Sequence, residues 1–360
     1  MDLIDKFVLM DYIEIKDYKS IREAKVELKP INILIGANGS GKSNFISFFE
    51  FLNRLYDQKL KEYVELNGGV DKFLHKGSKV SQEISSKVSF NNGEHAYSFT
   101  LTKGIDRFVF TKENLWYKSH QWEIATYESE GKINNENSPR ADYIIKYLSS
   151  LKRYRFQDTG RNSPFIQMSD IESDKYFLYE DGRNLAAFLY SIRKENHIEY
   201  NLIVKTIQSI APYFSDFYFQ PNAEGYVRLQ WQDKYSSTVY GPSDLSDGTV
   251  RFIALATLFM QPALPASIII DEPELGLHPF AISKLAGMMQ SAAAKGTQVI
   301  VATQSSDLVN HFEPDAIITV DQVDGETVFK RLQREELSAW LEDYSLGDLW
   351  QRNILDGGQP

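Results

Sequence analysis

A glycine-rich run near the start of the sequence could cradle a phosphate group. It reads Gly36-Ala37-Asn38-Gly39-Ser40-Gly41-Lys42-Ser43 and matches G-x-x-x-x-G-K-[ST] at every fixed position. Such glycines let backbone N–H groups curl around phosphates, and the N-terminus of a following helix adds a positive end. We expect Lys42 to reach the β- and γ-phosphates of a nucleotide and Ser43 to ligate Mg²⁺.

A pair of carboxylates, Asp271 and Glu272, could supply the remaining chemistry. They follow three apolar residues, Ile268-Ile269-Ile270. A strand of this kind would deliver both acids to the crevice where open α/β sheets bind ligands. Asp271 is then suited to hold Mg²⁺ through water and Glu272 to polarise an attacking water molecule. A solvated turn is the alternative for two adjacent acids, and the phosphate loop upstream favours the chemical role.

A third motif, Leu245-Ser246-Asp247-Gly248-Thr249-Val250-Arg251, could form a second anion site. Ser246 can cap a helix, and Gly248 lets the backbone approach a phosphate. One nucleotide does not need two such helix ends from one subunit. The economical explanation is that Ser246 and Gly248 serve the nucleotide of a partner subunit. The alternative is a capped helix start without a ligand.

The elements around the phosphate loop have the pattern that this motif requires. Residues 31–35 are a short, mostly apolar run, which predicts a strand buried on both faces. From residue 44 onward the spacing becomes helical, and one stripe holds the apolar residues Phe45, Phe48, Phe49, Leu52, Leu55 and Tyr56. The loop is therefore predicted to lie between a strand and a helix.

The remaining elements predict an α/β fold. Alternating apolar and polar residues at 12–15, 24–28 and 88–127 predict an antiparallel β region, with turns at Asn91-Asn92-Gly93 and Gly104. Helical patterns cover 142–156 and 183–210. After them the sequence predicts a strand over 267–270, a helix over 279–295, a strand over 297–302, a hairpin of 316–320 with 327–332, and a helix over 335–350 that breaks at Gly347.

We therefore predict a P-loop fold with a mixed central sheet, an N-terminal antiparallel β subdomain and an inserted α-helical subdomain. The expected division is an N-terminal lobe over 1–135, a helical insert over 136–242 and a C-terminal lobe over 243–360. Residues 252–270 contain no charge but include two prolines, so we interpret them as helix, loop and strand and expect no membrane span.

Composition limits the partners and the compartment. The formal charge of −10 disfavours a surface that coats nucleic acid indiscriminately, although a local basic groove remains open. The basic run Lys152-Arg153-Tyr154-Arg155, interleaved with aromatic residues, is one candidate, and a solvated helix end is the alternative. The absence of cysteine excludes a disulfide framework and a cysteine-ligated zinc site, and it fits a reducing cytoplasm.

Taken in order, five segments resemble the motifs of ABC-type ATPases. Residues 36–43, 245–251, 268–272, 275–278 and 299–304 resemble the phosphate loop, signature, Walker B, D-loop and switch segments. The sequence is most similar to the soluble branch that includes SMC, RecF and OLD-type ATPases. The residues that carry this are Asp17-Tyr18-Lys19-Ser20-Ile21, Ser43-Asn44-Phe45, Asp271-Glu272-Pro273-Glu274 and Tyr344-Ser345-Leu346-Gly347-Asp348-Leu349-Trp350.

The resemblance implies a head-to-tail homodimer that sandwiches two ATP molecules, each with Mg²⁺. Gln304 then stands at the switch position, where many ABC proteins have a histidine. Glutamine can donate a hydrogen bond but carries no charge, so slow turnover is expected. Gln157 is the candidate for the glutamine loop, which contacts nucleotide and metal. The nucleotide-binding set implied is residues 36–43 with Asn44, Gln157, Ser246 and Gly248.

Three functions fit these residues. The first is an ATP-gated dimerising switch that works on or near DNA in repair or antiphage defence. The second is the ATPase subunit of a toxin or nuclease system whose effector is a separate protein. The third, the motor subunit of a membrane transporter, is disfavoured because the segment between the phosphate loop and the signature is long and rich in β-structure.

Overall fold

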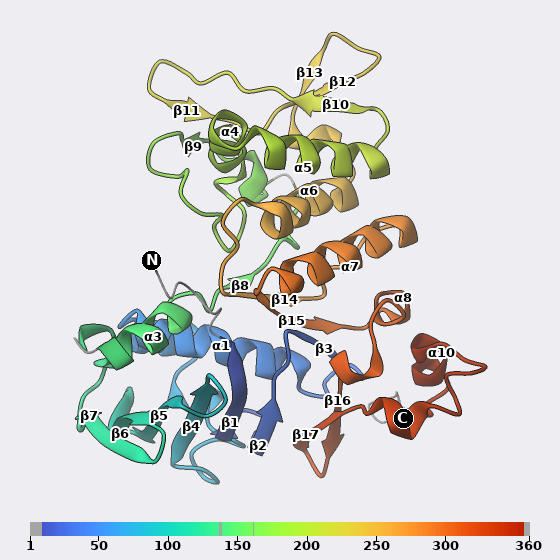
Figure 1. The fold of residues 1–360 in the computed structure, drawn as a ribbon. Helices are drawn as coiled ribbons and strands as arrows, with labels where there is room; N and C mark the ends of the chain where they lie inside the picture. The colour runs from blue at the N-terminus through green and yellow to red at the C-terminus, as the bar shows by residue number, and fades with distance from the viewer. Residues whose placement is uncertain (1–8, 137–138, 161, 356–360) are drawn as a thin grey trace, which may run out of the picture. The chain divides into compact units, whose positions relative to one another are not determined.

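The computed structural model describes residues 9–136, 139–160 and 162–355, which fall into two compact units (Figure 1). The first unit contains the described residues up to 153 together with 265–269 and those from 296 onward, and the second contains 154–264 and 270–295. The chain returns to the first unit because β15 (Gln298–Thr303) pairs with β3 (Ile31–Ile35). The boundaries of the two units therefore differ from the boundaries expected from the sequence, which were at residues 135 and 242.

The antiparallel sheet of the first unit was predicted from its alternating residues. Its order is β2-β1-β4-β5-β6-β7 (Figure 1). The strands are β1 (Met10–Tyr18), β2 (Ile21–Glu27), β4 (Glu83–Phe90), β5 (His95–Lys103), β6 (Phe108–Tyr117) and β7 (His120–Ala125). Ile13 of β1 lies opposite Val88 of β4, and both side chains are fully buried. Asn91 and Asn92 turn the chain between β4 and β5 with φ of 56° and 55°, a conformation that asparagine tolerates.

The second sheet of the first unit is mixed, as predicted, and has the order β17-β16-β3-β15-β14-β8. β3 is parallel to both neighbours, and Ile33 lies opposite Val301 of β15 and Ile317 of β16. β16 (Ile317–Val323) and β17 (Glu326–Arg331) form the predicted hairpin. Both turn residues, Asp324 and Gly325, have positive φ, as a tight hairpin turn requires. The remaining strands are β14 (Ser267–Asp271) and β8 (Arg153–Tyr154).

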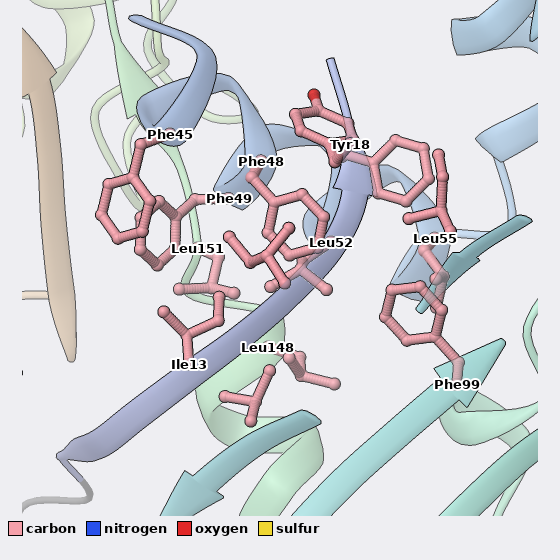
Figure 2. Close-up of a cluster of buried hydrophobic side chains, with 14 of the residues drawn as sticks. Ile13, Tyr18, Phe45, Phe48, Phe49, Leu52, Leu55, Phe99, Leu148 and Leu151 are labelled. Carbon is pink, nitrogen blue, oxygen red and sulfur yellow. The ribbon is translucent and has the colours of Figure 1, made fainter. Parts of the chain in front are cut away.

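The core of the first unit is built around α1 (Lys42–Tyr56), the helix that follows the glycine-rich loop. Figure 2 shows its apolar stripe facing Tyr18 and Ile13 of β1 and Leu148 and Leu151 near α3 (Pro139–Leu148). The stripe residues Phe45, Phe48, Phe49, Leu52 and Leu55 are all fully buried. Aromatic rings also surround the fully buried Phe51, namely Tyr18, Phe48, Phe73, Phe99 and Phe108. Burial of this stripe fixes the position of α1, whose first turn contains the end of the glycine-rich loop. The short α2 (Leu60–Leu66) follows α1.

The second unit contains the predicted helices and small strands that the sequence did not reveal. Its helices are α4 (Leu185–Glu195), α5 (His197–Ile210), α6 (Asp247–Met260) and α7 (Pro279–Ala294). Its strands are β9 (Ser169–Asp170) with β11 (Tyr226–Val227), and β10 (Phe214–Phe217) with β12 (Trp231–Asp233) and β13 (Val239–Tyr240). These strands span two to four residues, which is too short for an alternating pattern to stand out.

Two predicted helices have different bounds in the structure. The helix expected over 142–156 ends at Leu148, where Ser149 and Ser150 turn their hydroxyl groups back to the carbonyl oxygens of Lys146 and Tyr147. Such bonds compete with continuation of a helix. The helix expected over 335–350 is two short helices, α9 (Arg334–Leu337) and α10 (Leu346–Gln351). The break precedes Ser345, whereas Gly347 lies inside α10.

In the part of the chain that the structure describes, no helix has both the length and the apolar character needed to cross a bilayer. Residues 252–270 form the end of α6, a loop and the start of β14, as predicted.

Replacing Phe51 by alanine is expected to destabilise the first unit by about 3–5 kcal/mol, because the cavity left among five aromatic rings cannot collapse fully. Urea unfolding followed by tryptophan fluorescence measures the change. As a control, Ile105→Ala removes a side chain that is 94% exposed and should shift the midpoint by less than about 0.5 kcal/mol. Equal effects of the two substitutions would contradict the assignment of this core.

Candidate functional site

Three glycines of the loop are required either by their backbone conformation or by a close neighbour, and Gly41 is required by both. Gly39 and Gly41 adopt φ of 81° and 112°, a region that side chains rarely allow. A Cβ atom on Gly36 would lie 2.2 Å from the carbonyl oxygen of Val320, and one on Gly41 would lie 2.1 Å from Thr327 Oγ1. The β16–β17 hairpin therefore touches the loop at two points, and only glycine fits at either of them.

Lys42 places its ammonium group at the start of the loop. Lys42 Nζ donates hydrogen bonds to the carbonyl oxygens of Gly36 at 2.6 Å and Ala37 at 2.9 Å, and the residue is 5% exposed. Asn38 and Ser43, by contrast, are exposed. Phosphate oxygens are stronger partners for an ammonium group than neutral carbonyls. A phosphate group that enters the loop can therefore take over these bonds.

A network of hydroxyl groups fixes the loop from behind. Thr327 Oγ1 lies 2.7 Å from Ser20 Oγ and 3.1 Å from the carbonyl oxygen of Ser40, and Asn44 Nδ2 donates to Ser20 Oγ at 2.7 Å. Asn44, which the resemblance assigned to the nucleotide, thus uses its amide group to hold the β1–β2 turn. Sequence reasoning missed Thr327, because a threonine in a predicted edge strand carries no distinguishing signal.

Gln304 lies beside the phosphate loop as a consequence of strand register. Thr303 of β15 is the partner of Ile35 of β3, so the next residues along the two parallel strands, Gln304 and Gly36, emerge at the same edge. Both residues, together with Ala37, line a cavity of about 400 Å³. The structure therefore brings the predicted switch residue to the loop, while its catalytic role stays a prediction.

In the second unit, the chain turns sharply at the end of β14, where the two acidic residues lie. Asp271 is the last residue of β14, and Glu272 follows with φ of 50°, in the left-handed region that a glutamate side chain disfavours. Leu275 N donates to the carbonyl oxygen of Glu272 at 3.4 Å, which closes the turn. Strained residues of this kind cluster at functional sites, so the observation supports the prediction that Glu272 has a functional role.

Gln157 contacts the backbone at the end of β14. Its Nε2 donates to the carbonyl oxygen of Asp271 at 3.2 Å. Arg251, from the signature segment, donates to the carbonyl oxygens of Phe156 at 3.0 Å and Gln157 at 3.1 Å. Burial lowers the pKa of Arg251, although an arginine keeps its charge at neutral pH. Arg251 was not assigned a role from the sequence, since an arginine on a helix is usually solvated.

The signature segment begins α6 as predicted. Ser246 is the N-cap residue, and its Oγ accepts a hydrogen bond from Thr249 N at 3.2 Å. A Cβ atom on Gly248 would lie 2.2 Å from the carbonyl oxygen of Gly276. Gly248 was expected to make room for a phosphate, and in the structure it makes room for this carbonyl. Ser246, Gly248 and Gly276 line a cavity of about 350 Å³.

The predicted site residues divide between the two units. The first unit holds the phosphate loop, Lys42, Ser43, Asn44 and Gln304, and the second holds Gln157, Ser246, Gly248, Asp271 and Glu272. Among the described residues, no group of three or more histidines and acids gathers as a metal site. The oxygen donors that P-loop proteins use for Mg²⁺ are nevertheless present, namely the exposed hydroxyl group of Ser43 and the carboxylate of Asp271.

The basic run at 152–155 does not offer aromatic rings to a nucleic acid. Tyr147, Tyr154 and Phe156 are all buried. Arg153 lies 3.7 Å from Glu50 in an ion pair whose side chains are 16% and 11% exposed. Stacking on bases needs exposed rings, so the interpretation of this run as a nucleic-acid groove is not supported.

Comparison with known proteins identifies a family. The sequence matches the family described as "AAA domain, putative AbiEii toxin, Type IV TA system" over residues 31–310, which is more than half of the chain. It is also 33% identical over 81 residues to the energy-coupling factor transporter ATP-binding protein EcfA of Methanocaldococcus jannaschii. That match spans 22% of this chain and 28% of the relative's length.

Two solved structures share the fold. One is an SMC head bound to the C-terminal winged-helix domain of ScpA, with a TM-score of 0.61, 16% identity and coverage of 92% of this chain and 99% of that chain. The other is an SMC head with an extended coiled coil bound to the C-terminal domain of ScpA derived from Pyrococcus furiosus, with a TM-score of 0.58, 16% identity and coverage of 93% and 99%. The predicted P-loop head fold is confirmed.

Gly36→Ala is expected to weaken ATP binding at least tenfold, because the new methyl group and the Val320 carbonyl oxygen cannot coexist without a shift of the loop. Isothermal titration calorimetry with Mg-ATP measures the affinity. Gly287→Ala is the matched control, since a Cβ atom there would meet no atom within 4 Å. Unchanged affinity in Gly36→Ala would contradict the proposed fit of loop and hairpin.

Proposed function

Because the chain belongs to the family described as "AAA domain, putative AbiEii toxin, Type IV TA system", and its family and fold are those of P-loop ATPases, we propose that it hydrolyses ATP as a dimerising switch. The observation that carries the proposal is the phosphate loop. Its glycines are held in the required backbone conformations, and Lys42 Nζ bonds the first carbonyl oxygens of the loop. The rate of ATP hydrolysis is expected to be low.

The proposed chemistry uses few side chains. Lys42 neutralises the developing charge on the β- and γ-phosphates, and loop N–H groups bind phosphate oxygens. Glu272 accepts a proton from the attacking water, and Gln304 orients that water or the γ-phosphate by hydrogen bonding. Ser43, Asp271 and Gln157 would hold Mg²⁺, which supplies positive charge to the phosphates. Because Gln304 cannot carry charge, ATP can act mainly as a clamp between subunits.

We infer the dimer from a second, proposed anion site. Ser246 and Gly248 stand at the start of α6, a long helix whose capped N-terminus favours negative charge. One ATP needs one phosphate loop, so we assign the α6 terminus to the nucleotide of a second copy. Each ATP would then lie between the loop of one subunit and the signature of the other.

The biological process is inferred from the family and from the structural neighbours. The family description names a toxin of a type IV toxin–antitoxin system, which favours antiphage defence over repair. Our leading proposal is a nucleotide-gated switch that acts on or near DNA in such defence. The second candidate is an ATPase subunit that regulates a separate toxin or nuclease, and it is favoured by the two structural neighbours described above, each of which is an SMC head bound to a ScpA domain. A transporter role is supported only by a match to 28% of one relative. A cytoplasmic location stays a prediction.

Glu272→Gln should bind ATP, lose hydrolysis and accumulate as dimers, because the closed state forms but cannot proceed without the base. Light scattering at saturating ATP measures the mass. A mutant that remains monomeric would overturn the composite site. The double substitution Glu272→Gln with Gly248→Ala is the control, since a methyl group at 248 collides with Gly276 and should prevent dimerisation while leaving ATP binding intact.

Added DNA is expected to raise ATP turnover, and this rise should shrink as salt screens phosphate contacts. A steady-state phosphate-release assay with single- and double-stranded DNA tests it. Absence of stimulation by either DNA, together with co-purification of a neighbouring gene product, would favour the effector-subunit candidate instead.

A further inference from the structure

The C-terminal segment 344–350 forms a capped helix, α10, beside a cavity that also borders the phosphate loop. Ser345 caps α10, where its Oγ accepts from Asp348 N at 3.2 Å and Asp348 Oδ2 accepts from Ser345 N at 3.1 Å. Leu346 and Leu349 are buried at 5% and 0% exposure. Trp350, the last residue of this segment, lines the cavity beside the phosphate loop.

α10 is fastened to the segment that follows Gln304. Gly347 N donates to Asn310 Oδ1 at 2.6 Å, and a Cβ atom on Gly347 would lie 2.7 Å from the carbonyl oxygen of Ser306. Gln351 Nε2 donates to Ser306 Oγ at 2.7 Å. Ser306 begins α8 (Ser306–Val309), two residues after Gln304. The position of the switch segment therefore depends on α10 as well as on β15.

The cavity between these elements is suited to an anion. Its walls are Gly36 and Ala37 of the loop, Gln304 and Ser306 of the switch segment, and Trp350, Gln351 and Asn353 of the C-terminal segment. Among these lining residues none has a charged side chain, although the whole chain has a formal charge of −10. Amide, hydroxyl and indole groups all donate hydrogen bonds. The lining residues therefore present polar groups and no carboxylate to a phosphate group.

We propose that the C-terminal segment is the wall of the site that recognises the terminal phosphate of ATP. Trp350 borders that phosphate and distinguishes ATP from ADP, and Gln351 is a positioning residue that holds Gln304 through Ser306. This inference rests on the proposed ATPase function. It supplies what the uncharged Gln304 lacks, since several neutral donors together can replace one charged donor at a phosphate.

Tryptophan substitutions test the contact directly. Mg-ATP is expected to change the tryptophan fluorescence of the wild type and of Trp340→Phe, which alters a ring that is 46% exposed and does not line the cavity. Trp350→Phe should lose most of that change. It should also bind ATP about tenfold more weakly by calorimetry, with ADP affinity unchanged, because the indole N–H bond is lost. An unchanged preference for ATP and an unchanged fluorescence response in Trp350→Phe would overturn the role of Trp350.

The positioning role of Gln351 has a separate readout. Gln351→Ala and Ser306→Ala should each lower kcat by a similar factor with little change in KM, and the double substitution should lower it no further. Additive effects would overturn the coupling through Ser306. A wild-type chain that binds neither nucleotide would refute both this inference and the proposed function. A wild type that hydrolyses ATP, with Lys42→Ala inactive and the C-terminal variants normal, would refute only the inference.

Discussion

Parallel pairing of β3 with β15 and β16 is the constraint on which the rest of the first unit depends. Ile35 lies opposite Thr303 and Thr319, so β3 and β15 end at the same edge of the sheet, beside β16, which continues to Val323. Gly36, Gln304 and Val320 are the next residues of these strands. Backbone hydrogen bonds between the strands therefore place three features together: the loop, the switch residue and the carbonyl oxygen that lies against Gly36. Side-chain contacts are not needed to explain this placement.

One glycine in each motif allows another segment's backbone to approach closely. Gly36 faces the Val320 carbonyl oxygen and Gly248 faces that of Gly276, and a Cβ atom would lie 2.2 Å from either oxygen. In each unit a motif thus packs against a second segment that lies elsewhere in the sequence. Thr327 and Ser20 play the same part for the rest of the loop. The geometry of both motifs depends on such supporting segments as well as on the motif residues.

Sequence reasoning succeeded where a local pattern decides the structure. The bounds of β3 and the turn of the β16–β17 hairpin follow from apolar runs and from Asp324-Gly325. It failed where the structure depends on a distant contact or on a short element. Examples are the two-residue strands of the second unit and the end of α3, which comes earlier than predicted. The phosphate loop and Ser246 were recognisable because their chemistry lies in consecutive residues. Thr327 and Arg251 were not, since their contacts are with segments that only the folded chain brings near.

The left-handed backbone of Glu272 has a consequence for the balance between stability and activity. A side chain other than glycine at a φ of 50° costs roughly 1–2 kcal/mol. Glycine at this position would release that strain and would also remove the carboxylate assigned to catalysis. The protein therefore keeps its proposed base at the expense of folding free energy, and inactive variants at this position can be more stable than the active chain.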